Sequence, residues 1–206
     1  WFSGYLYSVA VSGTHAYIGD GAGVQVIHVS AGADLTLQGR LDADAGWGLA
    51  VPPAGATLYV AACDQGLLIA DLTDPATPDR AGAYTTPVGR AKDVAVSGQH
   101  AFVAAFEQGL QIVDVSDPWN MKQAGSYDTR GRAVGITVAS VEGVDYAYLA
   151  LGNDGVDVVN VEERTTPTST ASFDTPGVAN DVAVLLDPLS ADGAYYALVA
   201  DGWRLE

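Results

Sequence analysis

The sequence predicts an all-β fold, a β-propeller in which each repeat of 42 to 46 residues forms one four-stranded blade. The first observation behind this prediction is a glycine ahead of a short strand, which recurs at Gly4, Gly46, Gly89, Gly131 and Gly177. The second is a glycine that opens a long apolar strand in the same phase, at Gly23, Gly66, Gly109 and Gly155. The third is strand periodicity between these glycines, with no helical 3.6-residue stripe. Residues 1–206 are therefore predicted to form about five repeats of one propeller domain.

Each repeat begins with two short strands joined by a turn. The first is an alternating apolar segment, at residues 9–11, 49–51, 94–96, 136–138 and 182–184. The second is richer in β-branched and aromatic residues, which fit a pleated surface, and lies at residues 16–18, 58–60, 101–103, 147–149 and 197–199. We expect an antiparallel hairpin from each pair.

The third strand of each repeat is the longest, and a turn and a shorter fourth strand follow it. The third strand is nearly continuous in apolar residues, which predicts that both faces are covered, at residues 24–29, 67–72, 110–115 and 156–161. Asp74-Pro75 and Asp117-Pro118 fit the first two positions of a type I turn, because Asp bonds to nearby backbone and Pro fixes φ. Fourth strands are expected near residues 82–84 and 125–127.

Composition excludes several classes of function. The chain carries 25 Asp and Glu against 9 Lys and Arg, a formal charge of −16 that repels phosphate backbones and anionic lipid headgroups. We therefore expect no nucleic-acid partner. No run of 18 apolar residues occurs, so no membrane span is predicted. Cys63 is the only cysteine, which excludes an intrachain disulfide and gives no indication of redox chemistry.

The third strand and its turn carry a resemblance to a known family. Residues 110–118 (LQIVDVSDP) resemble the motif that names the LVIVD-repeat family, and residues 67–75 (LLIADLTDP) are a second close copy. The resemblance covers nearly the whole chain, although two repeats depart from the Ser-Asp-Pro turn, at residues 30–32 and 162–164. It implies a β-propeller, often in secreted or surface-attached bacterial and archaeal proteins, and it carries over no catalytic residue.

The fifth repeat begins at Gly177 and covers only about half a blade before residue 206. An open propeller end exposes strand edges, which natural proteins cover or close. We expect either that these residues belong to a longer chain, as a first residue of Trp1 also suggests, or that another chain pairs with the edge.

The variable residue after each glycine of the first series is predicted to lie at one mouth of the central channel, because these residues occupy equivalent loops. These residues are Tyr5, Trp47, Arg90, Arg132 and Val178. Lys92 and Arg130 lie next to the same loops. Aromatic faces and Arg forks suit anionic groups, sugars or a protein hot spot, which predicts a partner-binding site at Tyr5, Trp47, Arg90, Lys92, Arg130 and Arg132. The alternative is that the Arg residues only pair with neighbouring carboxylates.

Acidic residues at repeated positions are a second set of candidates. Asp93 and Asp181 precede the innermost strand and could hold Ca²⁺, but two carboxylates are too few for its six to eight oxygen ligands. Solvated channel residues, with no metal or other cofactor, are the favoured interpretation. One polar position in the third strand favours a structural hydrogen bond to a neighbouring loop. It holds His28, Asp71, Asp114 and Asn160.

Known catalytic fingerprints are absent from the sequence, including the nucleophile elbow, the zinc-protease motif and the phosphate-binding loops. We therefore expect a non-enzymatic, secreted or cell-surface bacterial or archaeal propeller that acts as a binding or assembly module for a protein or glycan partner. Two alternatives stay open. One is a metal-dependent hydrolase or lyase that uses Asp93 and Asp181 in the channel. The other is a structural subunit of a larger extracellular complex.

Overall fold

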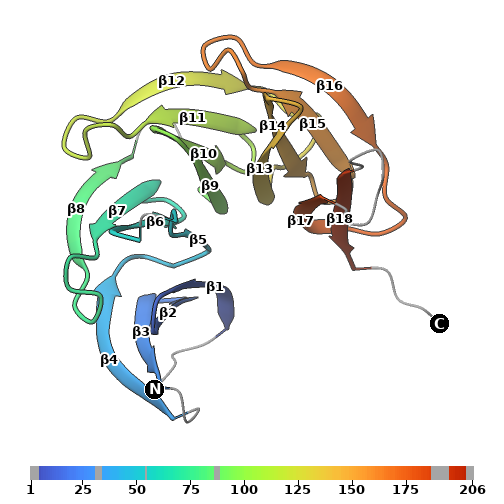
Figure 1. The fold of residues 1–206 in the computed structure, drawn as a ribbon. Helices are drawn as coiled ribbons and strands as arrows, with labels where there is room; N and C mark the ends of the chain where they lie inside the picture. Colours follow the sequence, from blue (N-terminus) through green and yellow to red (C-terminus); the bar gives the residue numbers. More distant parts are fainter. Residues whose placement is uncertain (1–4, 31–33, 54, 86–88, 187–194, 203–206) are drawn as a thin grey trace.

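The computed structural model describes residues 5–30, 34–53, 55–85, 89–186 and 195–202. All regular secondary structure in these residues is β-strand, in five antiparallel sheets that follow one another around an arc (Figure 1). Each sheet is a blade, and its first strand faces the centre of the arc. The predicted all-β, propeller-like arrangement is confirmed. In this part of the chain no helix is long and apolar enough to cross a membrane.

Four of the blades have four strands each, paired in sequence order. Blade 1 consists of β1 (Leu6–Ser12), β2 (His15–Asp20), β3 (Gly23–Val29) and β4 (Leu35–Asp42). Blade 2 consists of β5 (Gly48–Ala50), β6 (Thr57–Ala61), β7 (Leu67–Asp71) and β8 (Asp79–Tyr84). Blade 3 consists of β9 (Asp93–Ser97), β10 (His100–Ala104), β11 (Leu110–Asp114) and β12 (Lys122–Tyr127). Blade 4 consists of β13 (Gly135–Val141), β14 (Val144–Ala150), β15 (Val156–Asn160) and β16 (Thr168–Phe173). Among the described residues, blade 5 has β17 (Ala179–Leu186) and β18 (Tyr195–Asp201).

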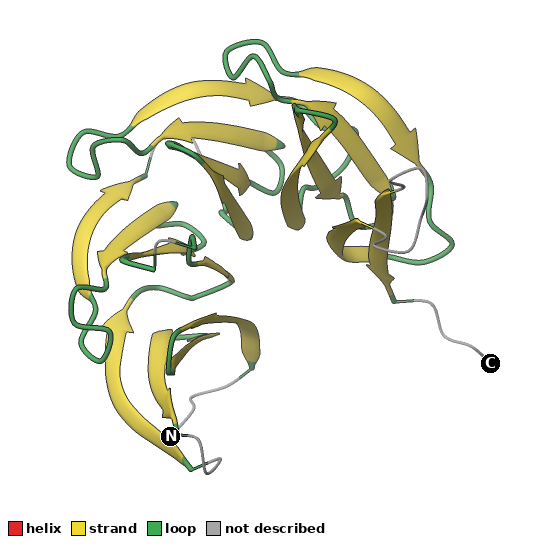
Figure 2. Ribbon diagram, viewed as in Figure 1, coloured by secondary structure: helices red, strands yellow, loops and turns green. Residues whose placement is uncertain are grey.

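The apolar core lies between the blades, which stand face to face around the arc (Figure 2). Strand β11 shows the arrangement, because Val113 packs with blade 2 side chains and Ile112 packs with blade 4 side chains. Both residues are fully buried. The prediction that the third strand is covered on both faces is therefore confirmed, and each such side chain contributes about 1.5–3 kcal/mol of hydrophobic stabilisation.

Glycines in the outer strands let neighbouring blades approach each other closely. A Cβ atom on Gly82 of β8 would collide with the carbonyl oxygen of Pro118 in the turn of the next blade. The same approach is made by Gly39 to Ala76 and by Gly125 to Arg164. The repeat therefore needs a residue without a side chain at this position.

The polar position at the end of the third strand stabilises the turn that follows it. A side-chain oxygen there accepts a backbone N–H from two residues further on, in Asp71 to Thr73 (2.7 Å), Asp114 to Ser116 (2.9 Å) and Asn160 to Glu162 (3.0 Å). The expected structural hydrogen bond is present, but it stays within its own blade because it closes an Asx turn, in which the side-chain oxygen accepts the N–H two residues further on. His28 instead makes an edge-to-face contact with His15, at 5.4 Å between ring centroids.

In blades 2, 3 and 4, the loop between the second and third strands joins the blade to the next one. The apex of the β10–β11 loop is Phe106, whose φ of 52° lies in the left-handed region. Its N–H and C=O pair with those of Ala133, both at 3.0 Å, where the chain enters blade 4. Equivalent paired bonds join Cys63 to Ala91 and Gly152 to Ala179. This connection fixes Phe106 beside the entrance that carries Arg132.

Candidate functional site

One structural position, at the start of the innermost strand or directly before it, lines the inner rim of the arc. In three blades this position is identified by a backbone hydrogen bond of 2.8 to 3.0 Å to the second strand. The N–H groups of Trp47, Lys92 and Val134 each donate to the carbonyl of the alanine that ends this strand. Tyr7 and Asn180 hold the same place in blades 1 and 5. A hollow of about 460 Å³ is lined by all five residues, Tyr7, Trp47, Lys92, Val134 and Asn180.

Side chains of this position stack across three blades. The rings of Tyr7 and Trp47 are 4.1 Å apart between centroids and inclined by 17°. The ammonium Nζ of Lys92 lies 3.3 Å from the centroid of Trp47. Because Tyr7 and the Lys92 ammonium are too close to the Trp47 ring to share one of its faces, the Trp47 ring lies between them. Burial lowers the pKa of the Lys92 ammonium.

Phe106 brings three cations together. The guanidinium carbons of Arg90 and Arg132 lie 5.9 and 5.0 Å from its ring centroid, and Nζ of Lys92 lies 5.5 Å from it. These are cation–π distances, and each such contact is worth about 0.5–1 kcal/mol at an exposed site. The left-handed backbone of Phe106 aims this loop at the neighbouring entrance, so the cluster depends on the inter-blade connection at Ala133.

The two Arg residues also have carboxylate neighbours. Arg90 Nε lies 3.8 Å from Asp64, and Arg132 Nη2 lies 3.6 Å from Glu107. The Arg side chains are 59% and 65% exposed, and ion pairs of this kind are worth about 0–1 kcal/mol. The alternative of pairing with neighbouring carboxylates is thus partly realised, but these pairs are weak enough for a ligand to replace them.

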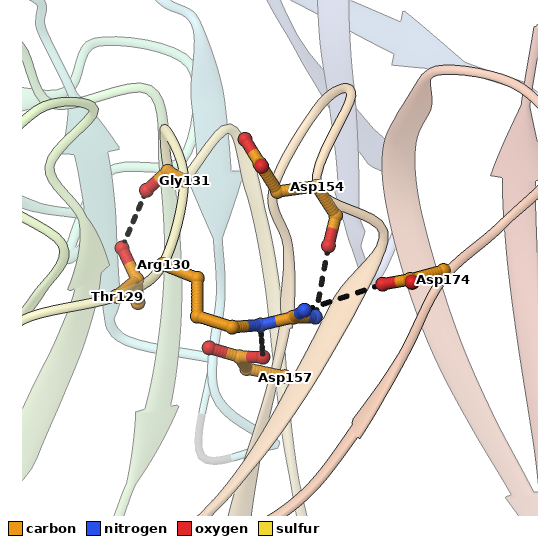
Figure 3. A network of polar contacts seen from close by, with 6 residues as sticks. All are labelled: Thr129, Arg130, Gly131, Asp154, Asp157 and Asp174. Carbon is orange, nitrogen blue, oxygen red and sulfur yellow. Dashed lines mark hydrogen bonds and ion pairs between the residues drawn. The ribbon is translucent and has the colours of Figure 1, made fainter.

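Arg130 has a different role, because its guanidinium is held within its own part of the fold (Figure 3). Its Nε donates to Asp157, which is fully buried, at 2.8 Å. Its terminal nitrogens donate to the Asp174 carboxylate at 3.2 Å and to the carbonyl of Asp154 at 2.9 Å. Hydrogen bonds to both carboxylates raise the pKa of Arg130. These bonds give Arg130 a structural function. Arg130 lines one hollow together with Phe106 and Arg132, but its guanidinium is bonded to Asp157, Asp174 and Asp154.

Asp93 also has a structural environment. Its carboxylate accepts the N–H of Val94 at 2.8 Å through Oδ1 and the N–H of Ile136, in the next blade, at 2.9 Å through Oδ2. Gly48 leaves the space that this carboxylate fills. Burial raises the pKa of Asp93 to about 7, against the lowering effect of the two backbone bonds. Asp181 repeats the arrangement in blade 5, where it accepts the N–H of Val182 at 2.8 Å.

The structure brings Trp47, Arg90, Lys92 and Arg132 together, but in a register that differs from the one predicted from the glycines. Trp47 shares its position with Lys92 and not with Arg90, because two fewer residues separate the glycine from the first strand in blade 2. Tyr5 is 82% exposed, and the described contacts place Tyr7, not Tyr5, against Trp47.

Sequence reasoning missed Tyr7 and Phe106. Ser8 and Asp93 hold equivalent places in the first strands of blades 1 and 3. Counting backwards from them, instead of forwards from the glycines, would have given Tyr7 the same position as Lys92. For Phe106 the sequence offers only its place in the loop that Cys63 occupies one repeat earlier. No local pattern shows that this loop reaches the next blade.

These blades define the class of the protein, which is a repeat protein with a propeller-like fold and a candidate site on its inner rim. The LVIVD repeat model matches residues 3–43, 54–86, 88–129 and 137–175, and the chain belongs to this family. Among solved structures, the chain is similar to the computationally designed Ika8 protein, with a TM-score of 0.66 and 10% identity. That match covers 96% of this chain and 60% of the designed chain, and it shows the fold alone. No curated protein matches the sequence.

Proposed function

We propose that the protein is a non-enzymatic binding module, secreted or at the cell surface, that takes a protein or glycan partner on the rim around Phe106. The observation that carries the proposal is the convergence of Arg90, Lys92 and Arg132 on this one ring in a chain of net charge −16. Three neighbouring cations repel one another, and an anionic partner group relieves that repulsion. Arg and aromatic side chains are also enriched at binding hot spots.

The carboxylates support a structural role and not a catalytic one. Asp93 accepts backbone hydrogen bonds at both oxygens, so a metal would have to displace them. The proposed function therefore involves neither a metal nor a catalytic group. Placement outside the cytoplasm is supported by what the LVIVD resemblance implies about secreted and surface-attached proteins.

A mixed array of glycans and peptides tests the proposal, probed with the protein and with its Arg90→Gln/Arg132→Gln variant. We expect at least one ligand class whose binding weakens tenfold or more in the variant, because a hydrogen bond to a charged group is worth about 1.5–3 kcal/mol. Arg80→Gln/Lys122→Gln is the matched control, since it removes the same charge from exposed outer strands. Equal binding by all three proteins, or binding by none, contradicts the proposal.

We also propose that the apolar faces at the two ends of the arc each pack against a further blade, supplied by more of the same polypeptide or by a second chain. On blade 1, Val9 and Val11 are 63% and 66% exposed, whereas Val94, at the place of Val9 in blade 3, is 4% exposed. On blade 5, Leu198 is 54% exposed, whereas Phe102 at the same place in blade 3 is fully buried. The faces of two copies therefore match as the faces of blades 3 and 4 do.

A further inference from the structure

Arg90 and Arg132 are equivalent residues in successive blades. Each lies where the chain enters its blade, and each faces the acidic residue that follows the loop apex of the preceding blade, Asp64 for Arg90 and Glu107 for Arg132. The propeller repeat thus presents the same cation twice, one blade apart, with both guanidinium groups close to the ring of Phe106.

Both guanidinium groups keep capacity for a ligand. Their nearest carboxylates lie 3.8 and 3.6 Å away, beyond the roughly 2.7–2.9 Å of a direct charged hydrogen bond. Other Arg residues of the protein have carboxylates at 2.6 to 2.8 Å, namely Arg40, Arg130 and Arg164. An incoming carboxylate therefore gains close contacts at Arg90 and Arg132 that the fold itself does not supply.

A hollow lies beside each of the two cations. One of about 220 Å³ is lined by Arg90, Gln108 and Phe106, and one of about 550 Å³ is lined by Arg132, Asn153 and Phe106. In each, a cation for a carboxylate stands beside an amide that can bond to a hydroxyl, and Phe106 gives both an apolar wall. Carboxylates also line the hollows, Asp64 and Glu107 in the first and Glu107 and Asp154 in the second, so a sugar carboxylate has to take the place of the weak ion pairs to Asp64 and Glu107. This combination suits an acidic sugar unit in each hollow.

We propose that the two hollows bind an acidic polysaccharide, with the carboxylate of one uronate sugar on Arg90 and that of another on Arg132. A polymer of identical acidic units carries its charge at regular intervals, as the blade repeat carries its cations. This inference rests on the proposed function and specifies a glycan, instead of a protein, as the partner at that rim. Because the chain as a whole repels polyanions, the affinity comes from contacts at the two Arg residues.

Isothermal titration calorimetry with oligogalacturonate, a linear chain of uronate sugars, tests the inference. We expect the oligomer to bind, and to bind at least tenfold more tightly than monomeric galacturonate, which cannot reach both hollows. Fully methyl-esterified oligomer, which has the same backbone without charge, should bind at least tenfold more weakly. Arg90→Gln/Arg132→Gln should cause the same loss, and Arg80→Gln/Lys122→Gln should leave the affinity unchanged.

Equal affinity for the acidic and esterified oligomers overturns the inference. Binding that is unchanged in the Arg90→Gln/Arg132→Gln variant also overturns it. If oligogalacturonate does not bind but another ligand on the array still depends on these residues, the acidic-polysaccharide inference is wrong and the proposed binding function stands. If no ligand depends on them, both are wrong.

Discussion

Asp93 shows how the propeller changes the chemistry of one side chain. Its carboxylate sits between the inner strands of blades 2, 3 and 4, where it leaves water and joins β9 to β13 through the N–H of Ile136. Burial is the largest effect and raises the pKa to about 7, and the charge of Asp181 raises it further. The two backbone donors favour the carboxylate form but do not outweigh the loss of hydration.

Asp93 is therefore predicted to make the stability of the protein depend on pH. Its pKa is higher in the folded state than the value of 3.8 it starts from, so its contribution is complete below about pH 3.8 and is lost as the pH rises through about 7. The free energy of unfolding, measured with urea from pH 5 to 8, should fall with a slope of up to about 1.4 kcal/mol per pH unit. Asp93→Asn should remove this slope and, because its amide NH₂ meets a backbone N–H, should also lower stability.

The comparison with Asp93→Asn separates this effect from that of other carboxylates. Hydrogen bonds to Thr73 and Ser116 lower the pKa of Asp71 and Asp114, so these groups act only below about pH 4. Asp181→Asn is the control, because it should lower the pKa of Asp93 while keeping the slope. Parallel pH profiles for the protein and for Asp93→Asn would contradict the assignment.

The contact between outer strands and turns gives a prediction at the scale of the element. Gly82 has a negative φ, so a substitution there tests the approach of Pro118 and not backbone strain. Gly82→Ala should destabilise the protein by about 1–3 kcal/mol, the typical cost of overpacking, as measured by urea unfolding. Ala171→Gly is the opposite change at the equivalent, exposed place in β16, and should cost about 1 kcal/mol or less. An unchanged midpoint for Gly82→Ala would refute the contact.

Strands and turns could be predicted from the sequence where the residues that determine them lie close together along the chain. Strand order, blade period and the Asp-Pro turns follow from periodicity and turn chemistry, and the structure confirms them. The register of Trp47 could not be predicted, because the entrance to blade 2 is two residues shorter and a glycine series does not reveal this. The place of Phe106 depends on backbone pairing with Ala133 in another blade, which no local pattern specifies.

For the molecule as a whole, the repeat makes the two ends of the arc complementary. Each interior blade packs one face against the blade before it and the other face against the blade after it. Blade 1 leaves the first of these faces uncovered, and blade 5 leaves the second uncovered. Interior copies of these faces are buried, and the two end copies are exposed (Figure 1). A contact between the faces of two chains is heterologous, so it either closes a ring or extends into longer assemblies.

Multi-angle light scattering of residues 1–206 alone should therefore give a mass of two or more chains, because in that sample each end face can be covered only by a second copy. Val9→Lys/Val11→Lys should reduce it to one chain, because charged side chains on the blade 1 face cannot be desolvated against the apolar blade 5 face. Neither valine belongs to the core between blades 1 and 2, so the variant should keep its fold, as circular dichroism can check. Leu35→Lys/Phe173→Lys adds the same charge on exposed outer strands and should leave the mass unchanged. A single-chain mass for residues 1–206 alone would contradict the pairing of the two end faces, because large exposed apolar faces in solution favour association.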